Sequence, residues 1–396
     1  MRLRPLALLL LLLVLTLVGC GKDDAIVDPP PADTGLRVPE DYATLYDALA
    51  AAGLTDEVSL APGAYTVDAS LDRGVTVRAR RFTAGEVRLL DSRLTVRAPA
   101  GDRVVLEGLT MIGGDTLVSA PGGADLALVA CRLVRATLGV LYTVDGDLDL
   151  VDCDLDSLGR GGAVHVGGQA RLTWQGGAVR ACTADQAVID LRDEARASIA
   201  SVTFVDCPRY TIRHRGLTLE LDGCGFVQAT GPSLAVGAGA VAHAGGTAFL
   251  DSAWPAIEVA GQLTLDPCLI AGGLGDGPAI QLNAGGALFM VDTTVHDGAG
   301  PALTMAAGAA ATVSRSLLTW LAAPLATGAG ATVAALTFDN VDAWAPGLSA
   351  WSGLEAMRDA GQGNRETDPL YCSPDDLRLQ AGSPVAGWGG LQVGCQ

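Results

Sequence analysis

Charged side chains in two short segments have the types and spacing that could support proton transfer. The segments are VIDLRDEA (188–195) and RYTIRHRG (209–216). Arg213 and His214 follow Asp190 at distances along the chain that differ by a single position. If the chain repeats with a period near this length, the carboxylate lies beside one of these two side chains, with Arg215 close by. A general base in such a cluster and a simple salt ladder between coils are both consistent with the pattern.

A second group of charges lies in DLDLVDCDLD, where five aspartates alternate with apolar residues over positions 147–156. Alternation with a period of two predicts inward apolar side chains and outward carboxylates. The repeat described below aligns Asp147 with Arg171, Asp154 with Arg132, and Asp156 with Arg180. Asp149 and Asp152 have no aligned arginine, which leaves them as candidate calcium ligands. Calcium takes six to eight oxygens, so two carboxylates alone would bind it weakly.

The elements that would position these charges come from an internal repeat. An apolar residue followed by a short alternating strand recurs with a period of roughly 23 residues, at Val140, Val164, Val188, Ile212, Leu234, Ile257, Ile280, Leu303 and Leu325. A second phrase of the type L-x-x-C-x-L follows it in each unit. Units this short and rich in strands predict a solenoid of about twelve coils of 22–25 residues, in which neighbouring coils bury each other's inner face.

The ends of the repeat resemble those of right-handed parallel β-helix proteins of the pectate-lyase-like superfold. VPEDYATLYDALAAAG (38–53) and DEVSLAPGAYTV (56–67) are similar to the capping helix and first coil of that family, and residues 367–389 are similar to its closing segment. The resemblance implies an all-β solenoid at 58–345, an N-terminal cap at 36–57 and a loop-rich C-terminal cap at 346–396. It also implies that a lyase on this scaffold could use an arginine beside carboxylates as its base. Motifs of polygalacturonases and alginate epimerases do not occur.

The N-terminus has the features of an export signal. Arg2 and Arg4 precede an apolar stretch at 5–18 that is too short to span a bilayer comfortably. Residues 17–20, LVGC, resemble the lipobox of bacterial lipoproteins, which implies a signal peptide at 1–19, a lipidated Cys20 and a tether at 20–35. We therefore expect the mature chain to be anchored by lipid to a membrane of the bacterial envelope, at the outer membrane or cell surface.

Eight cysteines remain when Cys20 is set apart. Six fall at inward positions of the repeat, where they alternate with small residues, and we expect them to be core thiols. Metal binding by them is not expected, because no histidine shares their spacing. Cys372 and Cys395 lie outside the repeat, and a disulfide between them is predicted. The inward cysteines are Cys131, Cys153, Cys182, Cys207, Cys224 and Cys268.

Charge and composition limit the function classes. The formal net charge is −18, and it becomes −20 when Arg2 and Arg4 are removed with the signal. Such a surface repels nucleic acid, so no nucleic-acid partner is expected. Our first hypothesis is a non-catalytic β-helix that binds a glycan or a protein, or serves as envelope structure. The alternative is a polysaccharide lyase or hydrolase that uses Asp190, Arg213, His214 and Arg215, with no cofactor or with calcium.

Overall fold

The computed structural model describes most of the chain from residue 35 onward. The described residues are 35–80, 85–137, 139–159, 162–183, 187–207, 209–323, 325–327, 336–347, 349–352, 354–373 and 376–390. The expected signal peptide, Cys20 and most of the tether lie outside these ranges. No helix in the described part of the chain is long and apolar enough to cross a membrane.

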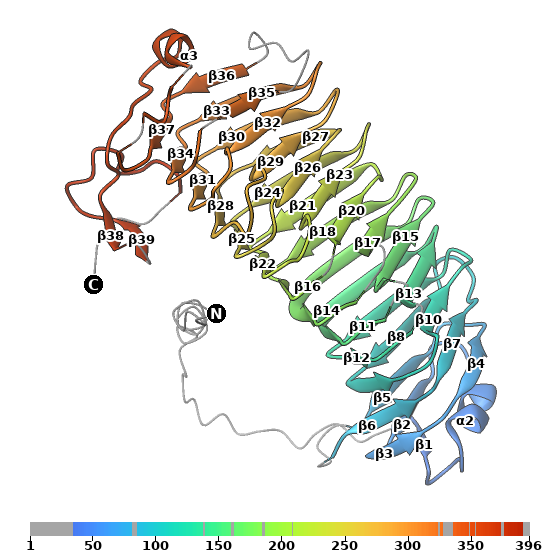
Figure 1. The fold of residues 1–396 in the computed structure, drawn as a ribbon. Coiled ribbons are helices and arrows are strands. Elements are labelled where there is room, and N and C mark those ends of the chain that lie inside the picture. Colours follow the sequence, from blue (N-terminus) through green and yellow to red (C-terminus); the bar gives the residue numbers. More distant parts are fainter. Residues whose placement is uncertain are drawn as a thin grey trace.

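The chain winds into a parallel β-helix of about twelve coils, as the repeat predicts (Figure 1). One parallel sheet has a single strand from each coil. Its strands are β4 (Asp68–Leu71), β7 (Arg93–Val96), β10 (Thr116–Ala120), β13 (Gly139–Val144), β15 (Val164–Gly167), β17 (Ala187–Leu191), β20 (Tyr210–His214), β23 (Leu234–Val236), β26 (Ile257–Val259), β29 (Ile280–Leu282), β32 (Leu303–Met305) and β35 (Leu325–Thr327). We call it the 12-stranded sheet.

The other two sides of the coils form one continuous sheet of 25 strands, because β14 and β16 run through the corner between them. Its strands are β1 (Leu36–Val38), β2 (Glu57–Leu60), β3 (Gly63–Tyr65), β5 (Thr76–Ala79), β6 (Val87–Leu90), β8 (Arg103–Glu107), β9 (Leu109–Ile112), β11 (Asp125–Val129), β12 (Arg132–Val134), β14 (Asp147–Asp156), β16 (Arg171–Arg180), β18 (Arg196–Ala200), β19 (Thr203–Val205), β21 (Thr218–Asp222), β22 (Gly225–Val227), β24 (Val241–Gly245), β25 (Thr247–Leu250), β27 (Gln262–Leu265), β28 (Cys268–Ala271), β30 (Ala287–Val291), β31 (Thr294–His296), β33 (Ala310–Ser314), β34 (Leu317–Thr319), β36 (Leu336–Asp339) and β37 (Asp342–Trp344).

Alternation of side chains along each strand builds the core inside the coils. Phe204, Phe226 and Phe249 are register partners on successive coils, and Trp174 of the coil before contacts Phe204 edge-on; all four are almost fully buried. The three phenylalanine rings are stacked with centroids 4.8 Å apart, which is the spacing of hydrogen-bonded strands. Identical residues in register therefore pack on each other from coil to coil.

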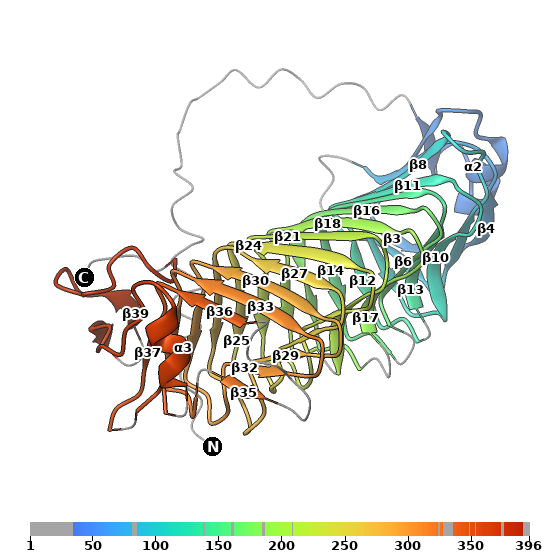
Figure 2. The ribbon, with the colours of Figure 1, turned by 90° about the horizontal axis from the view of Figure 1, so that it is seen from above.

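Both ends of the core are covered (Figure 2). At the N-terminal end, helix α2 (Leu45–Ala51), which the sequence predicts as the cap, buries Leu45, Ala48 and Leu49. Its first turn is capped by Thr44, whose hydroxyl accepts a hydrogen bond from the Asp47 backbone N–H at 3.1 Å.

The C-terminal segment adds helix α3 (Glu355–Ala360) and an antiparallel pair, β38 (Tyr371–Ser373) and β39 (Asp376–Leu379). This segment returns along the outside of the last coils. Leu379 and Val385 pack with Leu317 of β34 in a small apolar cluster of their own. Thr294 also donates a hydrogen bond to the backbone carbonyl of Gly389 at 2.9 Å. Trp351, whose ring lies edge-on to Phe338, belongs to the main core and covers its C-terminal end, whereas the later part of the segment packs on the 25-stranded sheet.

The six repeat cysteines are buried free thiols, as predicted. Cys131, Cys153, Cys224 and Cys268 each place the sulfur 3.2 to 3.4 Å from a backbone carbonyl of the preceding coil. Thr247 lies between Cys224 and Cys268 in this column, and its neighbour in register is Cys268. Thr247 donates to the carbonyl of Gly245 instead. The column thus takes small residues, and most of its members can donate one hydrogen bond.

The cysteine outside the repeat behaves differently. Cys372 is disulfide-bonded, as predicted for one half of the pair. Cys395, the partner that the sequence suggests, lies outside the described residues. Lipidation of Cys20 likewise remains a prediction.

Candidate functional site

A row of outward side chains crosses the 12-stranded sheet along the axis of the solenoid. Each member pairs in register with the next on the neighbouring coil. We call it the outer row, and it consists of Thr95, Ser119, Tyr142, His165, Asp190 and Arg213. Because adjacent strands are about 4.8 Å apart, these six side chains span roughly 24 Å of the surface.

The outer row settles the register that the sequence left open. Asp190 pairs with Arg213, and Leu191 pairs with His214. His214 therefore points into the core and is fully buried. Its Nε2 donates to the Val241 carbonyl at 3.0 Å, and burial lowers the pKa of its imidazole despite that bond. The suggestion that His214 acts with Asp190 at the surface is wrong, because one residue along a strand reverses the side on which a side chain lies.

Asp190 instead lies at the centre of three guanidinium groups, which together we call the arginine cluster. Arg213 donates from Nε to Oδ1 and from Nη2 to Oδ2, both at 3.0 Å. Arg192, two positions along the chain, donates from Nε at 2.5 Å. Arg215 reaches both oxygens from Nη2, at 3.1 and 3.2 Å. The sequence predicted Asp190, Arg213 and Arg215 as site residues, and the structure brings all three together.

The electrostatics of the arginine cluster favour an ionised carboxylate. The Asp190 side chain is 0% exposed, whereas those of Arg192, Arg213 and Arg215 are 48%, 25% and 46% exposed. Burial alone would raise the pKa of Asp190, but hydrogen bonds from Arg213 and Arg192 and the nearby charges lower it overall. Three cations and one anion leave two positive charges at the surface of an acidic protein. The arginine cluster can therefore attract and hold an anionic group.

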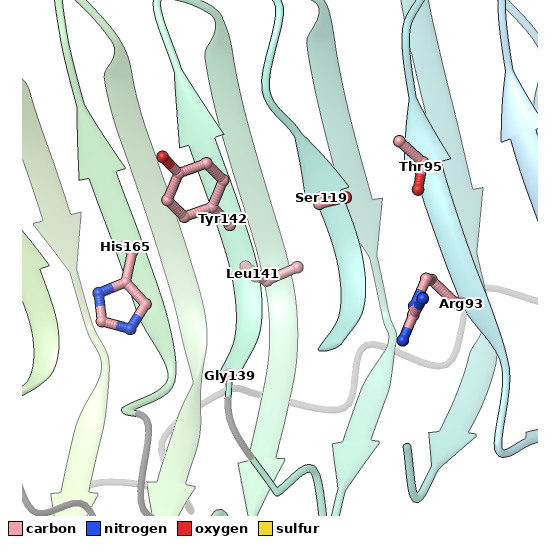
Figure 3. Close-up of a pocket in the computed structure, with 7 residues that line it drawn as sticks. All are labelled: Arg93, Thr95, Ser119, Gly139, Leu141, Tyr142 and His165. Atoms are coloured by element: carbon pink, nitrogen blue, oxygen red, sulfur yellow. The ribbon is translucent and has the colours of Figure 1, made fainter. Parts of the chain in front are cut away.

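An open hollow lies over the other four members of the outer row, next to the arginine cluster (Figure 3). Its volume is about 440 Å³, and the residues around it are Arg93, Thr95, Ser119, Gly139, Leu141, Tyr142 and His165. Figure 3 shows Tyr142 and His165 on one side, and Arg93 and Thr95 on the other. Tyr142 is 45% exposed. We refer to this feature as the hollow.

Sequence reasoning missed the residues of the hollow. Arg93, Tyr142 and His165 are not among the candidate residues that the sequence indicates. A signal was present, because Tyr142, His165, Asp190 and Arg213 follow the recurring apolar residue of each repeat at nearly the same offset. Tracing that offset across all coils would have placed the tyrosine and the histidine on the same surface as the arginine cluster.

The aspartates at 147–156 lie on the 25-stranded sheet, not on the outer row. Their predicted register with Arg171, Arg132 and Arg180 is confirmed. The ion pairs, however, are diagonal: Arg132 contacts Asp156 at 2.9 Å, and Arg180 contacts Asp154 at 3.7 Å. Long arginine side chains lean along the strand, so the closest carboxylate is two positions away from the aligned one.

The reason for considering Asp149 and Asp152 as calcium ligands does not hold in the structure. Asp149 was chosen because it had no arginine partner, but Arg103, two coils away, contacts it at 2.7 Å. Asp152 lies at the corner of β14 with a φ of 51° and is exposed. Within the described residues, no group of three or more His, Cys, Asp or Glu side chains is arranged to hold a metal ion.

Comparisons with known proteins agree with this architecture. No family model matches the chain, and no curated protein matches it in sequence. Among solved structures, a mutant of the PL6 family alginate lyase AlyGC is similar, with a TM-score of 0.52 and 13% identity. The match covers 91% of this chain and 57% of that protein, so the chain spans little more than half of its length. At this identity the likeness is one of fold, and the chain has the parallel β-helix fold of the pectate-lyase-like superfold.

Proposed function

We propose that this β-helix binds an acidic polysaccharide along the outer row and cleaves it as a lyase. The observation that carries the proposal is the arginine cluster, in which three guanidiniums surround one buried carboxylate and keep two positive charges at the surface. Planar guanidiniums bind carboxylates with two parallel hydrogen bonds, which suits a polymer of uronic acids.

The shape of the outer row supports a linear ligand. Its members are spaced regularly along the solenoid axis, so an extended sugar chain lying parallel to that axis would contact several of them in turn. The positive charge of this surface ends after Arg213, because the next two coils have Ala235 and then Glu258 at the same register position. Glu258 accepts a hydrogen bond from Tyr210 at 3.4 Å, and burial raises the pKa of its carboxyl group. The basic part of the surface therefore extends from Arg93 to Arg215.

The likeness to an alginate lyase supports the catalytic alternative more than the non-catalytic hypothesis that the sequence favoured. It does so through the fold alone. The regular length of the coils still favours a binder, since even coils leave little chain for loops that would enclose a substrate. Binding without cleavage is therefore the second function that the test must distinguish.

The test uses the full chain and a panel of uronic-acid polysaccharides, with a neutral polysaccharide as the control. Cleavage by a lyase is followed by the ultraviolet absorbance of the unsaturated product, and binding by calorimetry on short oligosaccharides. We expect Arg213→Ala to weaken binding by roughly tenfold or more, because a charge-assisted contact is lost. The matched control is Arg132→Ala, which removes an arginine that pairs with Asp156 on the 25-stranded sheet.

The outcomes separate the two functions. Unsaturated product that falls in Arg213→Ala and not in Arg132→Ala supports the lyase. Binding with the same dependence on Arg213 but without product supports a carbohydrate-binding protein. If neither binding nor cleavage is found across the panel, or if both variants behave alike, the proposal is wrong.

We also propose that Cys20 carries the lipid anchor and holds the β-helix at the bacterial envelope. The support is the signal sequence that ends in LVGC at residues 17–20. Replacing Cys20 with serine should release the protein from the membrane fraction, and mass spectrometry of the mature N-terminus should show the lipid. A soluble wild-type protein without lipid would exclude the anchor.

A further inference from the structure

We propose that the hollow is the reaction centre of the lyase, with Arg93 holding the uronate carboxylate, His165 as the base and Tyr142 as the acid. This assignment rests on the proposed function and names the residues that perform it. It differs from the expectation that an arginine of the Asp190 group is the base.

The arginine cluster is unsuited to remove a proton. Arginine stays protonated in proteins, so a guanidinium is a poor base unless its environment opposes the charge. Here the environment favours the charge, since Asp190 accepts hydrogen bonds from Arg192, Arg213 and Arg215. The cluster can therefore bind an anionic sugar, but proton transfer must come from other groups on the same surface.

The hollow supplies those groups one and two strand spacings from Asp190, roughly 5 and 10 Å away. Tyr142 and His165 are partners in register on β13 and β15, and His165 is in turn the register partner of Asp190. A polymer held by the arginine cluster therefore continues directly over the imidazole and the phenol. The volume of about 440 Å³ lies in the range of sites that bind small molecules.

The position of His165 exposes an edge of its ring to the hollow. Residue 139 on the neighbouring strand is glycine, and a Cβ at this position would lie 3.9 Å from His165 Cδ2. A larger side chain there would fill the space in which a sugar ring could approach the imidazole. Gly139 itself lines the hollow.

Arg93 completes the set from the opposite side. It lies on β7, two strands from Tyr142 and two residues before Thr95, the register counterpart of Tyr142, so the two backbones are roughly 12 Å apart and both long side chains can reach a ligand between them. Its register partner on β4 is Asp68, yet its side chain forms no ion pair with any residue in the part of the chain that the structure describes, and it is exposed. A cation in this state is available to the carboxylate of a substrate.

The chemical step is a β-elimination. Arg93 pairs with the carboxylate and stabilises the negative charge that develops when the neighbouring carbon loses its proton to the His165 imidazole. The electrons of that C–H bond form a C=C double bond, the adjacent C–O bond to the next sugar breaks, and the leaving oxygen takes the Tyr142 proton. The imidazolium then returns its proton to the Tyr142 phenolate, so that no further reactant is consumed.

Kinetics of three variants test the assignment. Tyr142→Phe and His165→Ala should lower kcat by about 100-fold or more with little change in KM, because proton transfer is lost and binding is kept. Added imidazole should restore part of the activity of His165→Ala and none of that of Tyr142→Phe. Arg93→Gln should raise KM and lower kcat together. Matched controls are His243→Ala and Tyr46→Phe, which change exposed residues on the 25-stranded sheet and on the cap.

A second measurement does not depend on turnover. The ring signals of His165, identified by comparing wild type with His165→Ala, are followed by NMR while a uronate oligosaccharide is added. We expect them to shift on saturation and the signals of His243 to stay in place.

The results distinguish this inference from the proposed function. If the wild type cleaves the polymer and the hollow variants keep their kcat, the lyase stands and the assignment to Arg93, Tyr142 and His165 is wrong. If the wild type only binds, the catalytic assignment is wrong, and a His165 shift shows that the hollow is a binding subsite. Restoration of His165→Ala by imidazole would support the base directly, because a purely structural role would not respond to it.

Discussion

Two charged surfaces of this β-helix, one on each sheet, are built by the same stacking of coils but differ in how their charges are arranged. On the 12-stranded sheet, one carboxylate, Asp190, is fully buried under three arginines. On the 25-stranded sheet, three of the five aspartates of β14 pair with arginines of other coils in partly exposed, diagonal contacts. The first surface concentrates positive charge around one fixed anion, whereas the second spreads negative charge over a strand.

Burial and the ratio of cations to carboxylates explain the difference. The Asp190 side chain has no contact with solvent, so its hydrogen bonds act in a medium of lower dielectric. The stability of the ionised carboxylate therefore depends on these hydrogen bonds. Asp156 is partly exposed, and its partner Arg132 is 54% exposed, so solvent replaces much of what the pair provides. The same type of ion pair should therefore be important in one place and nearly neutral in the other.

The largest expected effect is that of removing the buried anion. Asp190→Ala leaves three guanidiniums facing one another without their shared partner, and we expect a loss of about 3 to 5 kcal/mol in the free energy of unfolding. Chemical denaturation followed by circular dichroism measures it. Asp156→Ala is the matched control, with an expected loss below about 1 kcal/mol. Equal losses in the two variants would contradict the contrast between the surfaces.

A smaller effect is expected when one cation is removed from each surface. Arg213→Ala takes two hydrogen bonds of 3.0 Å from Asp190 but leaves Arg192 and Arg215 in place. We expect a loss of about 1 to 3 kcal/mol, the range for hydrogen bonds to charged groups. Arg132→Ala should cost a few tenths of a kcal/mol by the same denaturation measurement. A loss in Arg213→Ala as small as that in Arg132→Ala would show that the remaining two arginines satisfy the carboxylate alone.

Some of these structural features could be predicted from the sequence, and others could not. The coil length and the thiol columns follow from period and alternation, because identical environments recur once in every coil. The capping helix was expected only from the resemblance of residues 38–53 to the cap of a known family. The partner of Asp190 did not follow, since Arg213 and His214 both lie one coil length further on and a shift by one position decides which of them faces outward. The diagonal ion pairs and the hollow depend on how long side chains lean, which no alignment of the sequence contains.

Acid titration should separate the surfaces by the sign of a pKa shift. The pKa of Asp190 lies below the ordinary value because of its arginines, whereas burial and the neighbouring Asp125 raise the pKa of Asp147. The stability from Asp190 is therefore fully present above the unfolded pKa of about 3.9 and is lost as pH falls toward the folded value. Ionised Asp147 instead weakens the fold slightly, and protonation relieves this as pH falls.

Carboxyl carbon shifts measured by NMR against pH would report the two groups directly, with signals identified through Asp190→Asn and Asp147→Asn. We expect Asp190 to titrate at a lower pH than Asp147. The reverse order would mean that the arginine cluster does not hold its carboxylate as the hydrogen bonds indicate, and the electrostatic basis of the binding surface would fail with it.

The smallest expected effect is the coupling between Arg132 and Asp156, which contact each other at 2.9 Å. A double-mutant cycle with Arg132→Ala and Asp156→Asn should give a coupling of a few tenths of a kcal/mol, falling further with added salt, because the pair is exposed and screened. The corresponding cycle with Arg213→Ala and Asp190→Asn should give at least about 1 kcal/mol and resist salt. A coupling in the exposed pair as large as that in the buried one would mean that solvent exposure does not distinguish the two surfaces. The preference for the arginine cluster as the anion-binding site would then rest on its positive charge alone.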